Sequence, residues 1–123
     1  MNIINELQKD IGRPYEMFWD DNNYQGCFYP IYKAFPHLKK YPLPSENHEY
    51  NYKYGIALIE NHFVEVDKNN IKSLDMIATR FNDELHVALY IGNDQFYHVF
   101  RGHNLQIGRL KMFKKYKVYR VIQ

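Results

Sequence analysis

Cysteine is almost missing from this chain of 123 residues, in which Cys27 is the single thiol. One cysteine excludes an internal disulfide framework and a zinc site built from several cysteines. A lone thiol suits a reducing compartment or a reactive role. Cys27 is therefore either a small buried hydrophobe, the usual state of a free cysteine, or a nucleophile.

A strong charge of one sign and a long apolar run are missing as well. Sixteen Lys and Arg stand against 14 Asp and Glu, which leaves a net charge of +2. This excess is too small to indicate nucleic acid, and we do not expect it as a partner. No window approaches the ~20 apolar residues of a membrane span, and the first residues hold no apolar run for a signal-peptide core. We expect a soluble, cytoplasmic product that must be carried if it works elsewhere.

Aromatic residues are plentiful, with 12 Tyr and 8 Phe making most of an aromatic share of 17%. Tyr and Phe favour strands, so the composition indicates a substantial sheet. The length fits one core and leaves no room for a second. We therefore expect residues 1–123 to form a single domain.

Helical patterns come first along the chain, and strand patterns follow. Helices are predicted over residues 2–10, over a second segment that ends at Phe35 with its regular part starting at Pro30, and over residues 50–61. The predicted strands are FVEV, MIATRF, HVALYI, QFYHVF, LQIGRL and YKVYRVI. This order predicts an α+β fold, with N-terminal helices packed on an antiparallel sheet of five to six strands.

HVALYIGNDQFYH, residues 86 to 98, places a histidine at each end of a predicted hairpin. Side chains alternate between the faces of a strand, so His86 and His98 share a face only if the loop has an odd number of residues. A three-residue loop would pair Ile91 with Gln95 and Ala88 with His98. The two histidines would then be diagonal neighbours, roughly 5–8 Å apart at Cβ. Thiol, base and orienting group are thus available in one chain, although strand histidines are also common as packed residues.

Four segments of the sequence resemble one known family. DIGRPYEMFW has a helix end followed by Gly-x-Pro-Tyr and an aromatic residue, and Cys27 follows Tyr15 by 12 residues. SLDMIATRF is similar to a Gly-Asp strand start with Leu74 in place of the glycine, and HVALYIGNDQFYH carries two histidines 12 residues apart. These features resemble the NlpC family of papain-like cell-wall cysteine peptidases. The prolines before FVEV and the basic YKVYRV end are most similar to the short members of phage tail assemblies.

The resemblance implies a role for each of four residues. Cys27 would be the nucleophile, His86 the base, and His98 the group that orients His86. Tyr15 would place its hydroxyl near the thiol and the reacting carbonyl. The chemistry is consistent, because a thiolate beside a base performs acyl transfer, a third group fixes the imidazole tautomer, and a phenol stabilises developing negative charge.

The residues beside the nucleophile differ from the family pattern. The family usually has Asp-Cys-Ser-Gly, whereas this chain has Gly26, Cys27, Phe28 and Tyr29. These flanks keep a second hypothesis open, in which the site is degenerate and the protein is a tail assembly or binding component. A third hypothesis is a papain-like amidase or acyltransferase with a substrate outside the cell wall, since a fold does not fix a substrate.

KMFKKYKVYR, residues 111 to 120, is the densest basic run of the sequence. We interpret it as a solvated loop and edge strand, because lysines discourage pairing at the edge of a sheet. The alternative is attraction to an anionic polymer.

The sequence thus predicts a hydrolase, a cysteine peptidase that cleaves amide bonds in peptidoglycan stem peptides. A phage tail or prophage context and tail-protein partners accompany this prediction. No metal or organic cofactor is needed, because two histidines and Cys27 lack a clear further zinc ligand and the chain has no HExxH motif.

Overall fold

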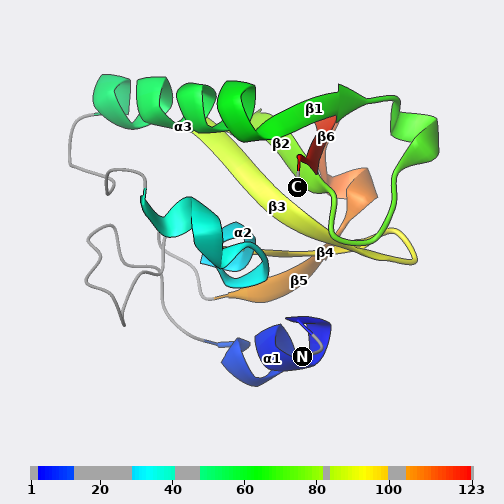
Figure 1. Cartoon of the computed structure of the whole chain (residues 1–123). Coiled ribbons are helices and arrows are strands. Elements are labelled where there is room, and N and C mark those ends of the chain that lie inside the picture. Colours follow the sequence, from blue (N-terminus) through cyan, green and yellow to red (C-terminus); the bar gives the residue numbers. More distant parts are fainter. Residues whose placement is uncertain (1–2, 13–28, 41–47, 82–83, 100–104, 123) are drawn as a thin grey trace.

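A computed structural model describes residues 3–12, 29–40, 48–81, 84–99 and 105–122 of the protein (Figure 1). Two of the expected site residues, Tyr15 and Cys27, lie outside the described residues. The α-helices are α1 (Ile3–Asp10), α2 (Tyr29–Ala34) and α3 (His48–His62). Short 3₁₀ turns are η1 (Pro36–Lys40), η2 (Lys68–Asn70) and η3 (Leu110–Met112).

Six strands form a single antiparallel sheet. They are β1 (Phe63–Val66), β2 (Met76–Phe81), β3 (Glu84–Gly92), β4 (Gln95–His98), β5 (Gln106–Arg109) and β6 (Lys117–Val121). Their order across the sheet is β1-β6-β2-β3-β4-β5. Helices followed by an antiparallel sheet confirm the predicted α+β class. All three predicted helices are present, although α2 begins at Tyr29, one residue before the predicted Pro30, and ends one residue before Phe35.

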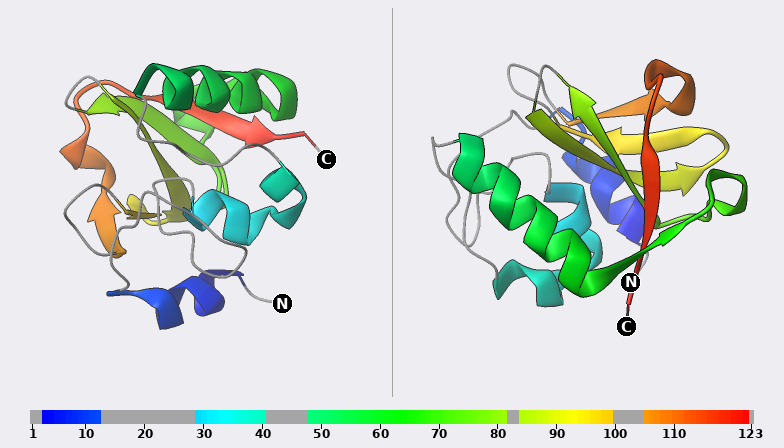
Figure 2. Two further views of the ribbon diagram at one scale, coloured as in Figure 1. Left: turned by 90° about the vertical axis from the view of Figure 1, so that its left-hand side faces the viewer. Right: turned by 90° about the horizontal axis from the view of Figure 1, so that it is seen from above.

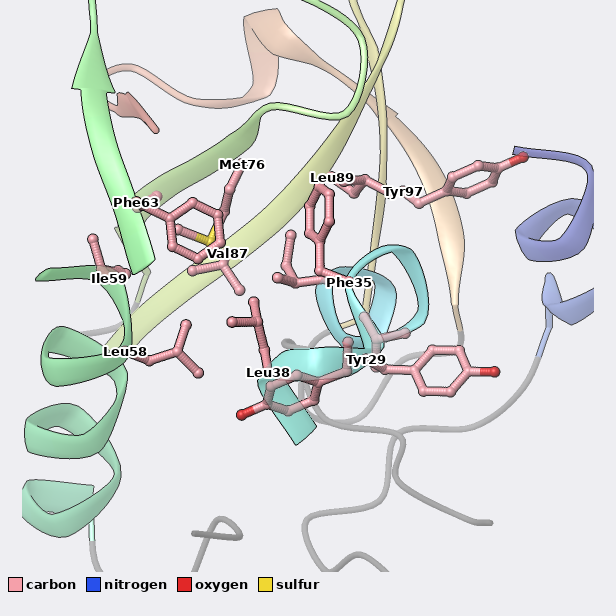
Figure 3. Packing of buried hydrophobic residues seen from close by; sticks show 14 of the residues in the cluster. Tyr29, Phe35, Leu38, Leu58, Ile59, Phe63, Met76, Val87, Leu89 and Tyr97 are labelled. Atoms are coloured by element: carbon pink, nitrogen blue, oxygen red, sulfur yellow. The ribbon is translucent and has the colours of Figure 1, made fainter. Parts of the chain in front are cut away.

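The three helices pack on one face of the sheet, with α3 and α1 at opposite ends of the layer and α2 between them (Figures 1 and 2). Apolar side chains from helices and strands meet in one cluster, the helix-side core (Figure 3). Its fully buried members include Leu7 of α1, Ile31 of α2 and Leu89 of β3. Burying these side chains supplies most of the driving force for folding. No helix among the described residues is long and apolar enough to cross a membrane.

Helix α1 is fixed to the sheet and to the chain before β5 by contacts near its C-terminal end. The hydroxyl of Tyr97 in β4 donates to the Gln8 side chain at 2.9 Å. Gly12 ends the helix with a φ of +97°, a left-handed conformation that glycine adopts without strain. Its N–H then donates to the carbonyl of Leu105 at 2.8 Å, which ties the helix end to the chain just before β5.

The opposite face of the sheet carries a second, smaller cluster, here called the loop-side core. Its buried residues are Ile77, Ala88, Tyr90, Phe96 and Phe113. Leu110 and Tyr116, from the β5–β6 connection, pack against it. Consecutive residues of β3 thus pack in different cores. Val87 and Leu89 belong to the helix-side core, whereas Ala88 and Tyr90 belong to the loop-side core.

The start of β2 is held by a buried carboxylate. Asp75 is 2% exposed and accepts two hydrogen bonds from Arg120, at 2.9 and 2.8 Å, and one from the backbone of Lys72 at 2.9 Å. The residue before it, Leu74, has a φ of +74°. This is the region that glycine favours, so Leu74 is strained at the position where the resembling family has glycine.

The basic run corrects one expectation. Lys111, Lys114, Lys115 and Lys117 are exposed, as expected for solvated residues. However, β6 pairs with both β1 and β2 and is an inner strand, so the prediction of an edge strand was wrong. Strand order depends on long-range pairing, which local composition does not encode.

Candidate functional site

The β3–β4 hairpin positions the two histidines. Its turn consists of Asn93 and Asp94, with φ values of 54° and 60°, and both positive angles are those of a type I′ turn. A two-residue loop pairs Gly92 with Gln95, so the predicted pairing of Ile91 with Gln95 was wrong. The register shifts between Tyr90 and Gly92, which adds one residue to β3 as a bulge.

The bulge restores the register that the histidines need. Below it, Leu89 pairs with Tyr97 and Tyr90 with Phe96. Continued by one residue, this register places Ala88 opposite His98, as the sequence predicts. His86 and His98 consequently point to the same face of the sheet, which is the face of the loop-side core.

The two imidazoles form a buried hydrogen-bonded pair. His86 Nε2 lies 3.1 Å from His98 Nδ1. The ring planes are inclined by 74°, and the side chains are only 4% and 1% exposed. Hydrogen bonding satisfies one nitrogen of each buried ring, which lowers the cost of removing these polar groups from water.

The loop-side core surrounds the histidine pair with aromatic rings. The Phe113 ring lies edge-on to both imidazoles, with centroid distances of 6.0 Å to His86 and 6.4 Å to His98. Phe96 meets His98 at 4.9 Å and is perpendicular to it. The sequence did not indicate a role for Phe113, which lies in the lysine run. The apolar pair of Met112 and Phe113 among lysines is the signal that would have indicated it.

Burial keeps His86 neutral. Removal from water is the main cause, and the neighbouring His98 adds to it, so that the pKa of His86 falls from 6.5 to about 3. A neutral imidazole has one nitrogen with a proton and one with a lone pair. If His86 Nε2 donates to His98 Nδ1, then Nδ1 of His86 carries the lone pair and can accept a proton from a nucleophile. An imidazole pair of this kind can act as a general base with an orienting partner.

Two contacts hold the start of α2, which follows Cys27 in the sequence. The Tyr29 hydroxyl donates to Asp10 Oδ2 at 2.6 Å, and Lys33 Nζ lies 3.5 Å from the same oxygen. Together with the Gly12–Leu105 hydrogen bond, these contacts hold the described residues on either side of range 13–28. Asp10 was not identified from the sequence as a connecting residue, because its partner lies 19 residues away.

His37 and His62 lie apart from the pair. The rings of His37 and His62 contact each other edge-on at 6.3 Å, beside the helix-side core. Within the described part of the chain, no three His, Cys, Asp or Glu side chains gather in a way that could hold a metal ion.

Comparisons with known proteins identify the fold. No family model and no curated protein matches the sequence. Solved structures do match: the NlpC/p60 domain of the peptidoglycan hydrolase SagA superposes with a TM-score of 0.64 at 18% identity, covering 94% of each chain. An NlpC/P60 family protein from Bacillus cereus gives 0.64 at 22% identity over 96% of this chain. A protein described as similar to lipoprotein, NLP/P60 family, from Staphylococcus aureus gives 0.64 at 20% over 98%.

This chain spans 38% and 40% of the length of the last two proteins. At such low identities the likeness concerns the fold. The chain therefore has the papain-like fold of NlpC/p60 domains, as the sequence predicts.

Proposed function

We propose that this protein is a cysteine peptidase of the NlpC/p60 type, which hydrolyses amide bonds in peptidoglycan stem peptides. Cys27 is the nucleophile, His86 the general base, His98 the residue that orients His86, and Tyr15 a hydrogen-bond donor to the reacting carbonyl. The observation that carries the proposal is the buried pair formed by His86 Nε2 and His98 Nδ1 at 3.1 Å. The pair occurs in the fold that a peptidoglycan hydrolase domain shares.

The chemistry begins with transfer of the Cys27 thiol proton to Nδ1 of His86. The thiolate attacks the amide carbonyl carbon, and the oxygen that becomes negative is stabilised by donors such as the Tyr15 hydroxyl. The C–N bond then breaks, and the leaving amine takes the proton from His86. A water molecule gives a proton to His86 and attacks the thioester. The C–S bond breaks, the departing thiolate takes the proton back from His86, and the carboxylic acid product releases its own proton to solvent as it leaves as a carboxylate.

The position of α2 constrains where the thiol approaches. Helix α2 packs on the helix-side core, whereas the imidazoles point to the opposite face. His86 pairs with Thr79 on its β2 side, whereas the described pairs between β3 and β4 run from Gly92–Gln95 to Leu89–Tyr97 and stop short of His86. We therefore expect Cys27 to reach His86 beyond the end of β4.

Digestion of purified peptidoglycan, followed by mass analysis of the soluble fragments, tests the proposal. We expect wild-type protein to release fragments with new carboxyl ends and Cys27→Ala to release none. Labelling with a thiol-specific electrophile gives a second readout, because an activated cysteine reacts at pH values well below the ordinary pKa of a thiol. Equal release of fragments by both proteins would contradict the proposed peptidase activity.

A second candidate is supported by the residues around Cys27. Gly26 and Phe28 provide neither the charge nor the hydrogen bond of the usual Asp and Ser. A protein with these flanks could instead be a degenerate tail assembly or binding component on the same fold. In that case, Cys27 would react with the electrophile no faster than an ordinary thiol, and digestion would show no product. A papain-like amidase or acyltransferase would react with the electrophile but leave peptidoglycan intact.

The phage-tail context belongs to this proposal. It is supported by the likeness of the proline-rich middle and the basic end to short tail-associated members. In this setting the virion carries the protein to the cell wall. Detection of the chain in purified particles by mass spectrometry would test the association.

A further inference from the structure

Gly108 on strand β5 leaves space for the ring of Phe96. The two residues are directly paired between β5 and β4. A Cβ at position 108 would lie 2.5 and 2.8 Å from two ring carbons of Phe96, and 2.8 Å from the sulfur of Met112. Side chains do not tolerate such distances, and Phe96 is fully buried and cannot move aside freely. Glycine is therefore required here for space.

The Phe96 ring is the first member of an aromatic stack that ends at the histidine pair. Phe96 and Phe113 are stacked almost parallel, at 4.9 Å and 8°. Both phenyl rings are nearly perpendicular to the His98 ring, with interplanar angles of 88° for Phe96 and 87° for Phe113. Phe113 also meets His86 at 69°. Perpendicular contacts of this kind are the preferred geometry of aromatic pairs and depend on ring orientation.

We propose that Phe96 and Phe113, in the space that Gly108 leaves, are positioning residues that fix the ring planes of His98 and His86. The torsion that turns an imidazole about its Cβ–Cγ bond is soft and broad, so a hydrogen bond at one nitrogen needs lateral support. Turning the His98 ring out of its plane would swing Nδ1 away from His86 Nε2 and weaken the hydrogen bond between them. The stacked rings oppose this rotation. His86 then keeps its proton on Nε2 and its lone pair on Nδ1.

The catalytic consequence of this positioning rests on the proposed function, whereas the ring geometry does not. Nuclear magnetic resonance of the whole protein with ¹⁵N-labelled histidine distinguishes imidazole tautomers through two-bond ¹H–¹⁵N correlations. At neutral pH we expect a single tautomer for His86, with the proton on Nε2. Gly108→Ala and Phe113→Leu should give mixed tautomers at His86 and His98. Ile107→Ala, on the same strand but facing the other way, is the matched control and should leave the spectrum unchanged.

A double variant separates positioning from simple stability. In Gly108→Ala/Phe96→Leu the smaller leucine makes room for the new methyl group. We expect its melting temperature to recover relative to Gly108→Ala, while the tautomers remain mixed. With peptidoglycan as substrate, kcat should stay about 10- to 100-fold below wild type, with little change in KM, because a misplaced base affects the chemical step.

Several outcomes would overturn the proposal. A single His86 tautomer in both Gly108→Ala and Phe113→Leu would do so. Mixed tautomers in the Ile107→Ala control would also do so. If Gly108→Ala does not fold, Phe113→Leu decides the matter by itself. If the wild type shows no turnover on peptidoglycan, the proposed function fails, and the tautomer spectra still decide whether the rings position the pair.

Discussion

The two faces of the sheet differ in what they bury. The helix-side core is lined by aliphatic and aromatic side chains from all three helices and from most strands. The loop-side core is smaller, is covered by the β5–β6 connection, and lies next to His86 and His98. These two residues and Asp75 are the buried polar or charged residues of the described chain. Consecutive residues of β3 therefore contribute alternately to stability and to the candidate site.

This division has a physical reason. A helix layer buries a large apolar area and stabilises the fold, but it leaves little room for a polar pair. A face that packs against a connecting segment can combine apolar rings with imidazoles, because such a segment brings fewer side chains than a layer of helices. We expect substitutions on the helix side to affect mainly stability, and substitutions on the loop side to affect mainly chemistry.

The largest expected effect comes from removing the reacting groups. Cys27→Ala and His86→Gln should each lower kcat by about 10³-fold or more, since the nucleophile and its base act as a unit. Both proteins should remain folded, because Cys27→Ala removes a single sulfur atom and glutamine keeps most of the volume and the hydrogen-bonding capacity of His86. Release of fragments from peptidoglycan and circular dichroism provide the two measurements. A His86→Gln protein with near wild-type turnover would show that the pair is only structural.

The matching change on the other face is Leu89→Ala. Leu89 is fully buried in the helix-side core, and its truncation should lower the free energy of unfolding by about 2–5 kcal/mol. Urea denaturation measures this loss. At a temperature where the variant is still folded, its kcat should remain within a few-fold of wild type. A large loss of kcat in the folded variant would show that the two faces are not separable.

Acid should destabilise the protein through the loop-side face. An unfolded histidine takes up a proton near pH 6.5, whereas burial keeps the pKa of His86 at about 3 in the folded chain. The unfolded state therefore binds more protons in this range, and stability present above pH 6.5 is lost as the pH falls towards 3. Between pH 6.5 and pH 5 the loss amounts to about 2 kcal/mol. Chemical denaturation at several pH values should show this slope in wild type and a flatter one in His86→Gln.

Substitutions of His98 should distinguish an orienting role from a packing role. In His98→Asn the amide oxygen can still accept a proton from His86 Nε2, whereas His98→Ala removes the acceptor. We expect kcat of the Asn variant to exceed that of the Ala variant by about tenfold, since an orienting hydrogen bond contributes on the order of 1 kcal/mol. Equal kcat values would contradict an orienting hydrogen bond.

The smallest effect concerns Leu74, whose positive φ strains the chain before β2. Leu74→Ala loses packing against the helix-side core and keeps the strain, while Leu74→Gly loses the same packing and relieves the strain. We therefore expect the glycine variant to be more stable than the alanine variant by about 1 kcal/mol, the reverse of the usual order. Thermal unfolding of both variants measures the difference. An alanine variant of equal or greater stability would show that Leu74 is not strained.

The sequence predicted the elements well because their signals are local. Alternating apolar residues identified all six strands, and loop parity led to a shared face for His86 and His98. The predicted odd parity was right although the predicted loop length was wrong. The two-residue turn and the one-residue bulge together have the same effect on the register as a three-residue loop. The preference of Asn93 and Asp94 for positive φ could have indicated the shorter turn.

The remaining features depend on contacts between distant residues. The inner position of β6 follows from its pairing with both β1 and β2. The role of Phe113 follows from a stack with Phe96, 17 positions earlier in the sequence. The place of Cys27 and Tyr15 relative to the imidazoles stays a prediction. The residues next to Phe113 in the sequence contain no information on which distant ring will stack against it.

The bulge at the end of β3 has a consequence for how this hairpin can change in evolution or by design. It makes the imidazole pair sensitive to whether the number of residues between the histidines is even or odd. Removing Ile91 would leave the I′ turn intact but would turn all residues before it to the other face, so that His86 would enter the helix-side core. Two residues could be added or removed together without this inversion. Length variation in homologous hairpins should therefore occur in steps of two, or in single steps with a gain or loss of a bulge.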